Sequence, residues 1–225
     1  MNWLRQTAVL LLKDLRIEWR GKEVLTAMIM FAFIVITVFA VVFDPVLTKF
    51  EKVIPGILWT ALFFAGNLGM NRAFVREMEN DALSGLLVCP VPRSAVYTAK
   101  LINQVILMLI AAVIVLPVLV VFFDMRMPLQ PEIFISILFL GSAGFSAVGT
   151  LLATMALKTR ARDMMLPVLL FPVTVPVILA SVKGTSLAMY SASDNAALPW
   201  LRILVGFDVI MITACLMLYD HVIDD

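Results

Sequence analysis

The sequence predicts an all-α integral membrane protein with six transmembrane helices. Of its 225 residues, 62% are hydrophobic and 15% are charged, whereas soluble domains average about 45–50% and about 25%. The apolar residues gather into six runs close to the roughly 20 residues that a helix needs to cross a bilayer. We therefore expect an interfacial segment over residues 1–23, followed by a single transmembrane domain over residues 24–225.

The first 23 residues predict an amphipathic helix at the membrane surface. Helical spacing places Leu4, Ala8, Leu11, Leu12, Leu15 and Trp19 on one apolar stripe, and Lys13, Arg16 and Arg20 on a basic face. A basic helix with an aromatic residue favours the interface on the side with anionic lipid. Packing against the chain's own spans is the alternative, and the two can hold together. The next apolar run lacks small residues at a cleavage position, so we expect no cleaved signal peptide.

The first two predicted spans cover residues 24–43 and 53–71, with a proline-containing turn between them. The second span carries small residues four positions apart, Ala61, Ala65 and Gly69. In lipid, such a face allows close helix packing, either within the chain or across a homodimer.

A short polar segment, the island, follows from Arg72 to Lys100. It contains the charged residues Arg72, Arg76, Glu77, Glu79, Asp81, Arg93 and Lys100, three leucines at helical spacing (Leu83, Leu86 and Leu87), and a turn at Pro90-Val91-Pro92. An amphipathic helix held at the membrane surface between two spans can serve as a handle for a soluble partner. A solvated loop whose leucines rest on the headgroups is the alternative.

The third and fourth predicted spans cover residues 101–123 and 133–157. The fourth repeats hydroxyl-bearing residues every four positions, at Ser142, Ser146 and Thr150. In lipid this pattern favours a packing face whose hydroxyls are available to neighbouring helices. A face that lines a substrate path is the second interpretation.

The fifth predicted span, residues 164–182, contains Pro167, Pro172 and Pro176. Each proline removes a backbone donor, which a membrane tolerates only where neighbours satisfy the freed carbonyls. We therefore expect a broken, buried helix, followed by a Ser/Ala/Gly-rich loop over residues 183–199.

The last predicted span, residues 200–219, contains Asp208, the only acidic residue well inside a predicted span. An intramembrane acid is a functional-site hypothesis by default. The alternative is that Asp208 is a hydrogen-bond partner of a neighbouring helix near the outer headgroups. A proton-driven carrier would need more ionisable groups at mid-membrane than this sequence provides.

The distribution of basic residues predicts the orientation. With six spans, twelve of the seventeen Lys and Arg residues fall on the side of the termini and the island, and the other five fall on the opposite side. Cytoplasmic loops carry the excess of Lys and Arg. Both termini and the island are therefore expected in the cytoplasm.

The residues that most enzymes and metal sites require are absent from this sequence. There is no G-x-x-x-x-G-K-[ST] nucleotide-binding pattern and no nucleophile–base pair, so we expect a non-catalytic subunit. The single histidine, His221, lies in the tail, so no His-based metal cluster is expected. The two cysteines lie far apart in sequence, so a disulfide framework is not expected either.

The island resembles the coupling segment of ABC-2-type exporter permeases, with R-E-x-E-x-D-A-L-x-G-L-L-x-x-P-V-P-R running from Arg76 to Arg93. Four more pieces narrow the resemblance: FDP at 43–45, PGILW at 55–59, LPVLLFPVTVPVILA at 166–180 and GFDVI at 206–210. Together they resemble the CcmB family, the haem exporter protein B of bacterial cytochrome c maturation. The resemblance covers essentially the whole chain. The coupling segment alone fits many ABC-2 permeases, whereas the proline-rich span is more specific.

This resemblance implies an inner-membrane permease that binds no cofactor directly, with an N-terminal elbow helix and a cytoplasmic coupling helix. ATP would be bound by a separate CcmA-like ATPase, and haem would be handled by CcmC-like and CcmD-like membrane proteins. Hydrolysis would drive haem delivery or release of the haem-loaded periplasmic chaperone CcmE. The ATPase-coupling residues would be Arg76, Glu77, Glu79, Asp81, Leu83, Leu86, Leu87 and Pro90. The alternatives are an ABC-2 exporter of a drug or lipid-linked glycan, and a non-transporting assembly scaffold.

Overall fold

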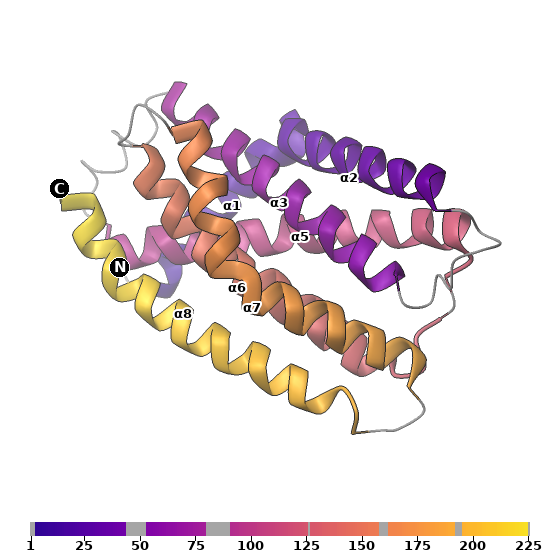
Figure 1. Cartoon of the computed structure of the whole chain (residues 1–225). Helices are drawn as coiled ribbons and strands as arrows, with labels where there is room; N and C mark the ends of the chain where they lie inside the picture. The colour runs from indigo at the N-terminus through magenta and orange to yellow at the C-terminus, as the bar shows by residue number, and fades with distance from the viewer. Residues whose placement is uncertain are drawn as a thin grey trace.

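The described part of the computed structural model, residues 3–43, 53–79, 91–125, 127–157, 162–191 and 195–224, is all-α. Within these ranges the helices are α1 (Trp3–Gly21), α2 (Glu23–Val42), α3 (Ile54–Glu79), α5 (Arg93–Phe123), α6 (Pro131–Leu157), α7 (Arg162–Tyr190) and α8 (Leu198–Asp224). Figure 1 shows α2, α3 and α5 to α8 side by side in alternating directions, with both chain ends at the same end of the bundle. The predicted all-α architecture is confirmed.

Five of the described helices are long and apolar enough to cross a membrane: Glu23–Val42, Arg93–Phe123, Pro131–Met155, Val168–Tyr190 and Leu198–Tyr219. They contain most of the predicted first, third, fourth, fifth and sixth spans, and the chain is a multi-pass membrane protein. The predicted second span falls in α3, which is not among the five. Its 26 residues are long enough, but Asn67, Asn71 and the charged end from Arg72 make its composition more polar.

Helix α3 lies inside the bundle, in contact with α2, α5, α6 and α7. Its Trp59, Phe63 and Ala65 are fully buried. The Trp59 indole Nε1 donates a hydrogen bond to Thr185 Oγ1 of α7 at 2.9 Å, and the Gln104 amide of α5 donates to the Gly66 carbonyl of α3 at 3.0 Å. Four other helices therefore cover much of α3.

Helix α6 is the centre of the core. Every residue from Gly141 to Thr150 is buried, and the rings of Phe145 and Phe63 lie 4.9 Å apart between α6 and α3. On the opposite side, the Tyr97 hydroxyl of α5 donates a hydrogen bond to the Ala147 carbonyl at 3.0 Å. Small side chains along α6 let its neighbours approach closely, as expected for helix packing in lipid.

The predicted break in the fifth span is wrong, because α7 runs as one helix from Arg162 to Tyr190. Pro172 and Pro176 lie on its exposed side, and the side chain of Pro167 lies outside the described residues. Between the two prolines, the Thr174 hydroxyl donates to the Leu170 carbonyl at 2.9 Å. Each proline removes one donor, and since the rings of Pro172 and Pro176 point away from the bundle, the helix continues past them.

The loop predicted over residues 183–199 is also wrong as far as residue 190, because α7 continues to Tyr190. Gly184, Thr185 and Ala188 are buried there, and Thr185 accepts the hydrogen bond from Trp59. Packing overrides the weak helix propensity of Gly184 and Thr185.

Candidate functional site

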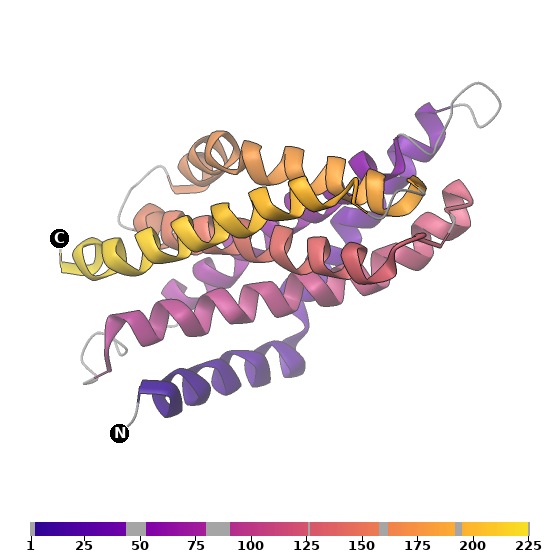
Figure 2. The same cartoon turned by 90° about the horizontal axis from the view of Figure 1, so that it is seen from below.

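Helices α3 and α5, which contain the first and last residues of the island, are both tied to α1. At the end of α3, Arg76 Nη1 lies 3.2 Å from Glu18 Oε2 of α1. At the start of α5, Ser94 Oγ accepts a hydrogen bond from the Trp3 indole Nε1 at 3.2 Å. Figure 2 shows α1 outside the bundle, beside α5. Helix α1 therefore connects the two helical ends of the island.

Glu18 also links α1 to α2. Its Oε1 accepts the backbone N–H of Leu25 at 2.9 Å, in the first turn of α2. First-turn N–H groups have no partner within their own helix, and a carboxylate at this position also suits the helix dipole. Between the two helices, Lys22 adopts a left-handed conformation with φ of 52°, which turns the chain. The Glu18 side chain thus joins α1, α2 and α3, and the residue is only 4% exposed.

A second charged contact lies at the same end of the bundle. The Lys100 ammonium of α5 lies 4.9 Å from the centre of the Phe74 ring of α3, and Lys100 is buried. Such a cation–π contact stabilises by about 0.5–1 kcal/mol when exposed and about 2 kcal/mol or more when desolvated. Together with the Glu18–Arg76 pair, it holds the ends of α3 and α5 in a defined arrangement.

The two faces of α1 have different surroundings: one packs on the protein and the other points outward. Thr7 and Glu18 are buried on the face that meets the other helices. Leu4, Leu12 and Trp19, from the predicted apolar stripe, point outward, and Trp19 is 76% exposed. The helix therefore packs on the protein and still presents apolar side chains to its surroundings.

The predicted small-residue faces lie inside the bundle. Ala61 and Ala65 are fully buried, and a Cβ atom at Gly69 would lie 2.6 Å from Cγ of Met28 on α2. Ser142, Ser146 and Thr150 on α6 are buried as well, and the Ser146 hydroxyl donates to the Met108 sulfur at 3.7 Å.

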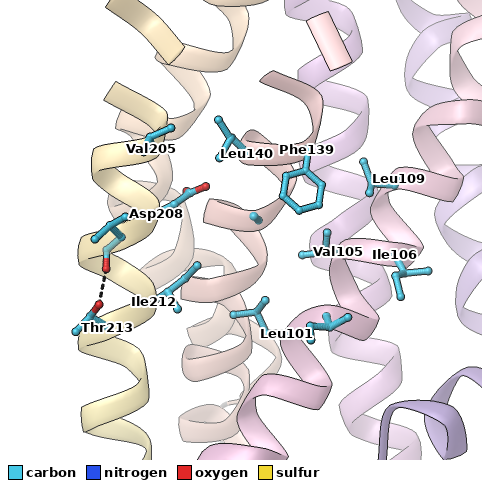
Figure 3. A pocket seen from close by; sticks show the side chains of 13 residues that line it. Leu101, Val105, Ile106, Leu109, Phe139, Leu140, Val205, Asp208, Ile212 and Thr213 are labelled. Carbon is cyan, nitrogen blue, oxygen red and sulfur yellow. Dashed lines mark hydrogen bonds between the residues drawn. The ribbon is translucent and has the colours of Figure 1, made fainter. Parts of the chain in front are cut away.

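A groove opens between α5, α6 and α8, with a cavity volume of about 520 Å³. Its walls are apolar, with Leu101, Val105 and Leu109 on α5, Phe139 on α6, and Val209 and Ile212 on α8. Asp208 of α8 is the one acidic residue that lines it. Figure 3 shows the Asp208 side chain directed from α8 toward α6. Below the groove, α5 and α8 meet through the rings of Tyr97 and Tyr219, whose centres are 5.1 Å apart.

Within the described part of the chain, Asp208 does not form the hydrogen bond to a neighbouring helix that was the alternative interpretation of this residue. The residue is 5% exposed, and within the described part of the chain neither carboxylate oxygen has a partner. Oδ1 lies against Gly144 of α6, where a Cβ atom would collide with it. Ten residues separate Asp208 from the start of α8 at Leu198, a rise of roughly 15 Å. This is about half the length of the apolar part of α8, Leu198–Tyr219, so Asp208 lies near the middle of that stretch.

Comparison with known proteins decides the family. A family model described as CcmB protein matches residues 5–221, nearly the whole chain. The chain belongs to the CcmB family.

Several curated proteins named heme exporter protein B are similar to this chain, some of them along most of its length. The heme exporter protein B of Rhodobacter capsulatus is 28% identical over 197 residues, which covers 88% of this chain and 88% of that protein. The protein of the same name from Pseudomonas aeruginosa is 22% identical over 199 residues, covering 88% and 89%. That of Escherichia coli K12 is 30% identical over 87 residues, covering 39% and 40%. The predicted family is thus confirmed.

Some of the ATPase-coupling residues expected for a CcmB family member lie in α3, and the others lie outside the described residues. Arg76, Glu77 and Glu79 belong to the last turns of α3. The side chains of Glu77 and Glu79 lie outside the described residues. Asp81, Leu83, Leu86, Leu87 and Pro90 also lie outside them. Of the island, the structure describes the two ends, which belong to α3 and α5.

The sequence alone did not predict the contacts that Glu18, Trp59 and Tyr97 make between helices. Glu18 lies four residues after Asp14 on α1, and two acids on one face of a basic helix were the available signal. The contacts between Trp59 and Thr185 and between Tyr97 and Ala147 join residues 126 and 50 positions apart, and no local pattern indicates them.

Proposed function

We propose that this chain is the membrane subunit of a heme-exporter-type ABC transporter complex that serves cytochrome c maturation. Its membership of the CcmB family and the name of its relatives support this function. The chain spans the bacterial inner membrane and performs no catalysis itself. A CcmA-like ATPase binds and hydrolyses ATP, and CcmC-like and CcmD-like membrane proteins handle haem and its chaperone CcmE. Two copies of the chain assemble in the complex.

The observation that carries the proposal is that α1 contacts both helical ends of the island, in α3 and in α5. Arg76 at the end of α3 and Ser94 at the start of α5 both bind α1. A soluble protein that binds between them acts on two helix ends that share one element. A displacement of the island is therefore passed to α1, α3 and α5 together.

In the proposed mechanism, Leu83, Leu86 and Leu87 dock in a groove on the ATPase, as helix-in-groove recognition does elsewhere. The surrounding charges set the register and the rate of association. Closure of the ATPase on ATP then moves the island, and the bundle shifts as packed helices that slide or rotate. The change reaches the outer face, where haem is delivered or its chaperone released.

We propose six spans, with α3 as the second and both termini in the cytoplasm. The twelve basic residues on one side against five on the other support this orientation. The enclosure of α3 by four other helices supports its membership, because an enclosed span can be less apolar than one that faces lipid. Helix α1 would then lie at the cytoplasmic surface as the elbow helix, with its outward apolar side chains in the interface.

The test is co-purification of the ATPase with leucine variants of the island, together with cytochrome c yield. If Leu86 and Leu87 fill a pocket on the ATPase, Leu86→Ala or Leu87→Ala costs about 1–2 kcal/mol or more of binding. Both variants should insert normally yet lose the ATPase, whereas Glu79→Gln has a milder, salt-dependent effect. Leu129→Ala is the matched control, because Leu129 is exposed in the connection between α5 and α6. Wild-type behaviour of both island variants would contradict the proposed coupling.

Two further measurements separate the alternatives. A passive scaffold leaves the turnover of the ATPase unchanged when the chain is added, whereas a coupled subunit alters it. Deletion of the chain should abolish cytochrome c assembly. Normal assembly in the deletion strain would instead favour an ABC-2 exporter of a drug or lipid-linked glycan.

A further inference from the structure

The outward face of α1 carries a row of arginines, Arg5, Arg16 and Arg20, which are all exposed. A helix turns by about 100° per residue, so these three side chains leave it within one narrow arc. That arc lies opposite Thr7 and Glu18, which are buried on the face that meets the other helices. The three positive charges therefore point away from the protein together.

The acidic residues of α1 do not neutralise this arginine row. Asp14 Oδ1 lies 3.1 Å from Lys13 Nζ, and Glu18 pairs with Arg76. Within the described part of the chain, no salt bridge joins any of the three arginines to an acidic side chain. Their charges are thus available to an anionic partner outside this subunit. Arginine suits phosphate in particular, because its guanidinium donates two parallel hydrogen bonds.

An apolar flank borders the arginine row on the same helix. Leu4, Leu12 and Trp19 are 71%, 61% and 76% exposed, and helical spacing places them between the protein-facing side of α1 and the arginines. Figure 2 shows α1 outside the bundle, beside α5. A helix with a basic arc next to an apolar arc binds in the plane of a membrane surface. Its apolar side chains then lie at the acyl boundary and its cations lie among the headgroups.

Two features favour lipid over an acidic soluble protein as the partner. Only Lys22 separates α1, which ends at Gly21, from α2, which begins at Glu23. Because Glu23–Val42 is long and apolar enough to cross the membrane, this short connection holds α1 at the membrane surface. In addition, an acidic soluble surface complements the arginines but not the apolar flank, whereas an anionic bilayer surface complements both.

We infer that α1 binds anionic phospholipid headgroups through Arg5, Arg16 and Arg20, and that this contact strengthens the coupling of the island to the bundle. Helix α1 contacts both helical ends of the island, through Arg76 of α3 and Ser94 of α5. Headgroups that hold α1 in the plane of the membrane keep it from lifting off the surface, so a displacement of the island is passed on to α3 and α5. The lipid contact stands on α1 alone, whereas its effect on coupling rests on the proposed function.

The first experiment tests the lipid contact with a photo-crosslinking residue, p-benzoylphenylalanine, placed at Leu12 in the apolar flank. The assembled complex is reconstituted in nanodiscs with equal amounts of phosphatidylglycerol and phosphatidylcholine, irradiated, and the adducts are identified by mass. We expect about threefold to tenfold more adducts with phosphatidylglycerol, the size of effect that one or two cations at an anionic surface support. The comparison position is Ile34, which is 55% exposed within the α2 span and should form both adducts equally.

Two double variants that remove the same charge then test the arginines. Arg16→Gln with Arg20→Gln shortens the row and should bring the adduct ratio at Leu12 close to one. Lys183→Gln with Arg202→Gln removes two exposed charges near the end of α7 and the start of α8, and should leave the ratio unchanged. Arg16→Lys with Arg20→Lys keeps the charges and should retain most of the preference. Salt should lower the unsubstituted ratio, because the Debye length falls from about 10 Å at 0.1 M to about 3 Å at 1 M.

The second experiment measures the effect of lipid on coupling. The turnover of the CcmA-like ATPase is compared in complexes reconstituted in phosphatidylcholine alone and with added phosphatidylglycerol. We expect phosphatidylglycerol to raise the turnover at least about twofold in the unsubstituted complex and in the variant with Lys183→Gln and Arg202→Gln. The variant with Arg16→Gln and Arg20→Gln should show no such increase. Retention of the ATPase in each purified complex shows that the variants are folded.

Three results would each overturn the lipid contact: equal lipid adducts at Leu12, adducts there with the ATPase or a second copy of the chain in place of lipid, or an unchanged ratio in the variant with Arg16→Gln and Arg20→Gln. Turnover that does not depend on phosphatidylglycerol would overturn its effect on coupling. An ATPase that does not respond to this chain in either lipid would instead contradict the proposed function. The adduct ratio at Leu12 would still decide the lipid contact, so the two failures are distinguishable.

Discussion

Glu18 and Arg76 form an ion pair at 3.2 Å between α1 and the end of α3, and the same carboxylate accepts the first-turn N–H of Leu25. Residues 58 positions apart in the chain are thereby joined at the point where α3 leads into the island. Helices α1, α2 and α3 thus meet at one buried side chain. The contribution of these Glu18 contacts to stability can be measured separately from transport.

We expect Glu18→Leu to destabilise the protein by about 1–3 kcal/mol, because it removes the carboxylate that contacts Arg76 and accepts the Leu25 N–H. Glu18→Gln should cost less, because the amide oxygen still accepts from Leu25. Reversible unfolding in mixed micelles, applied to Glu18→Gln, Arg76→Met and the double variant, gives the coupling energy. Strictly additive effects would mean that the pair contributes nothing.

Gly69 should not accept a larger side chain. A Cβ atom there would meet Met28 of α2, with Cγ at 2.6 Å, so Gly69→Leu forces α2 and α3 apart and should abolish monodisperse protein in size-exclusion chromatography. Adding Met28→Ala should recover part of the yield. The matched control is Gly206→Leu, because nothing lies within 4 Å of a Cβ atom at that position. Equal tolerance of both leucines would place the Gly69 face toward lipid.

The hydrogen bond from Trp59 to Thr185 should stabilise the contact between α3 and α7. Thr185→Val removes the acceptor of a buried donor at 2.9 Å and should cost about 0.6 kcal/mol, with about 1.7 kcal/mol as the upper bound for such bonds in membranes. Thr37→Val is the control, because Thr37 bonds only to its own helix. Unfolding in mixed micelles compares the two variants, and an equal or greater loss for Thr37→Val would show that the Trp59 bond has no special role.

The number of spans can be decided by the two chain ends. If α3 crosses the membrane, there are six crossings and both ends lie on the same side. If α3 does not cross, the five apolar helices place the ends on opposite sides. Alkaline phosphatase and green fluorescent protein fused in turn before Met1 and after Asp225 report the side of each end. We expect fluorescence and no phosphatase activity at both; phosphatase activity at either end would exclude the proposed topology.

The sequence by itself determined where five of the spans lie, because lipid imposes a length of about 20 apolar residues that can be read locally. It also indicated the buried faces of α3 and α6, because small residues repeat every four positions on each helix, as Ala61 and Ala65 do on α3, and small residues suit close packing. The family could be recognised from the island and the proline-rich span, because such patterns are continuous in the chain.

Only the tertiary structure decided which side chains meet between helices. The pairing of Glu18 with Arg76 and the isolation of Asp208 depend on the rotation and register of each helix, which all of its neighbours set together. For the same reason α7 continues past Gly184, where packing against α3 and α6 outweighs local propensity. Hydropathy is a property of a segment, whereas a contact is a property of two segments, and it forms only once their faces are turned toward each other.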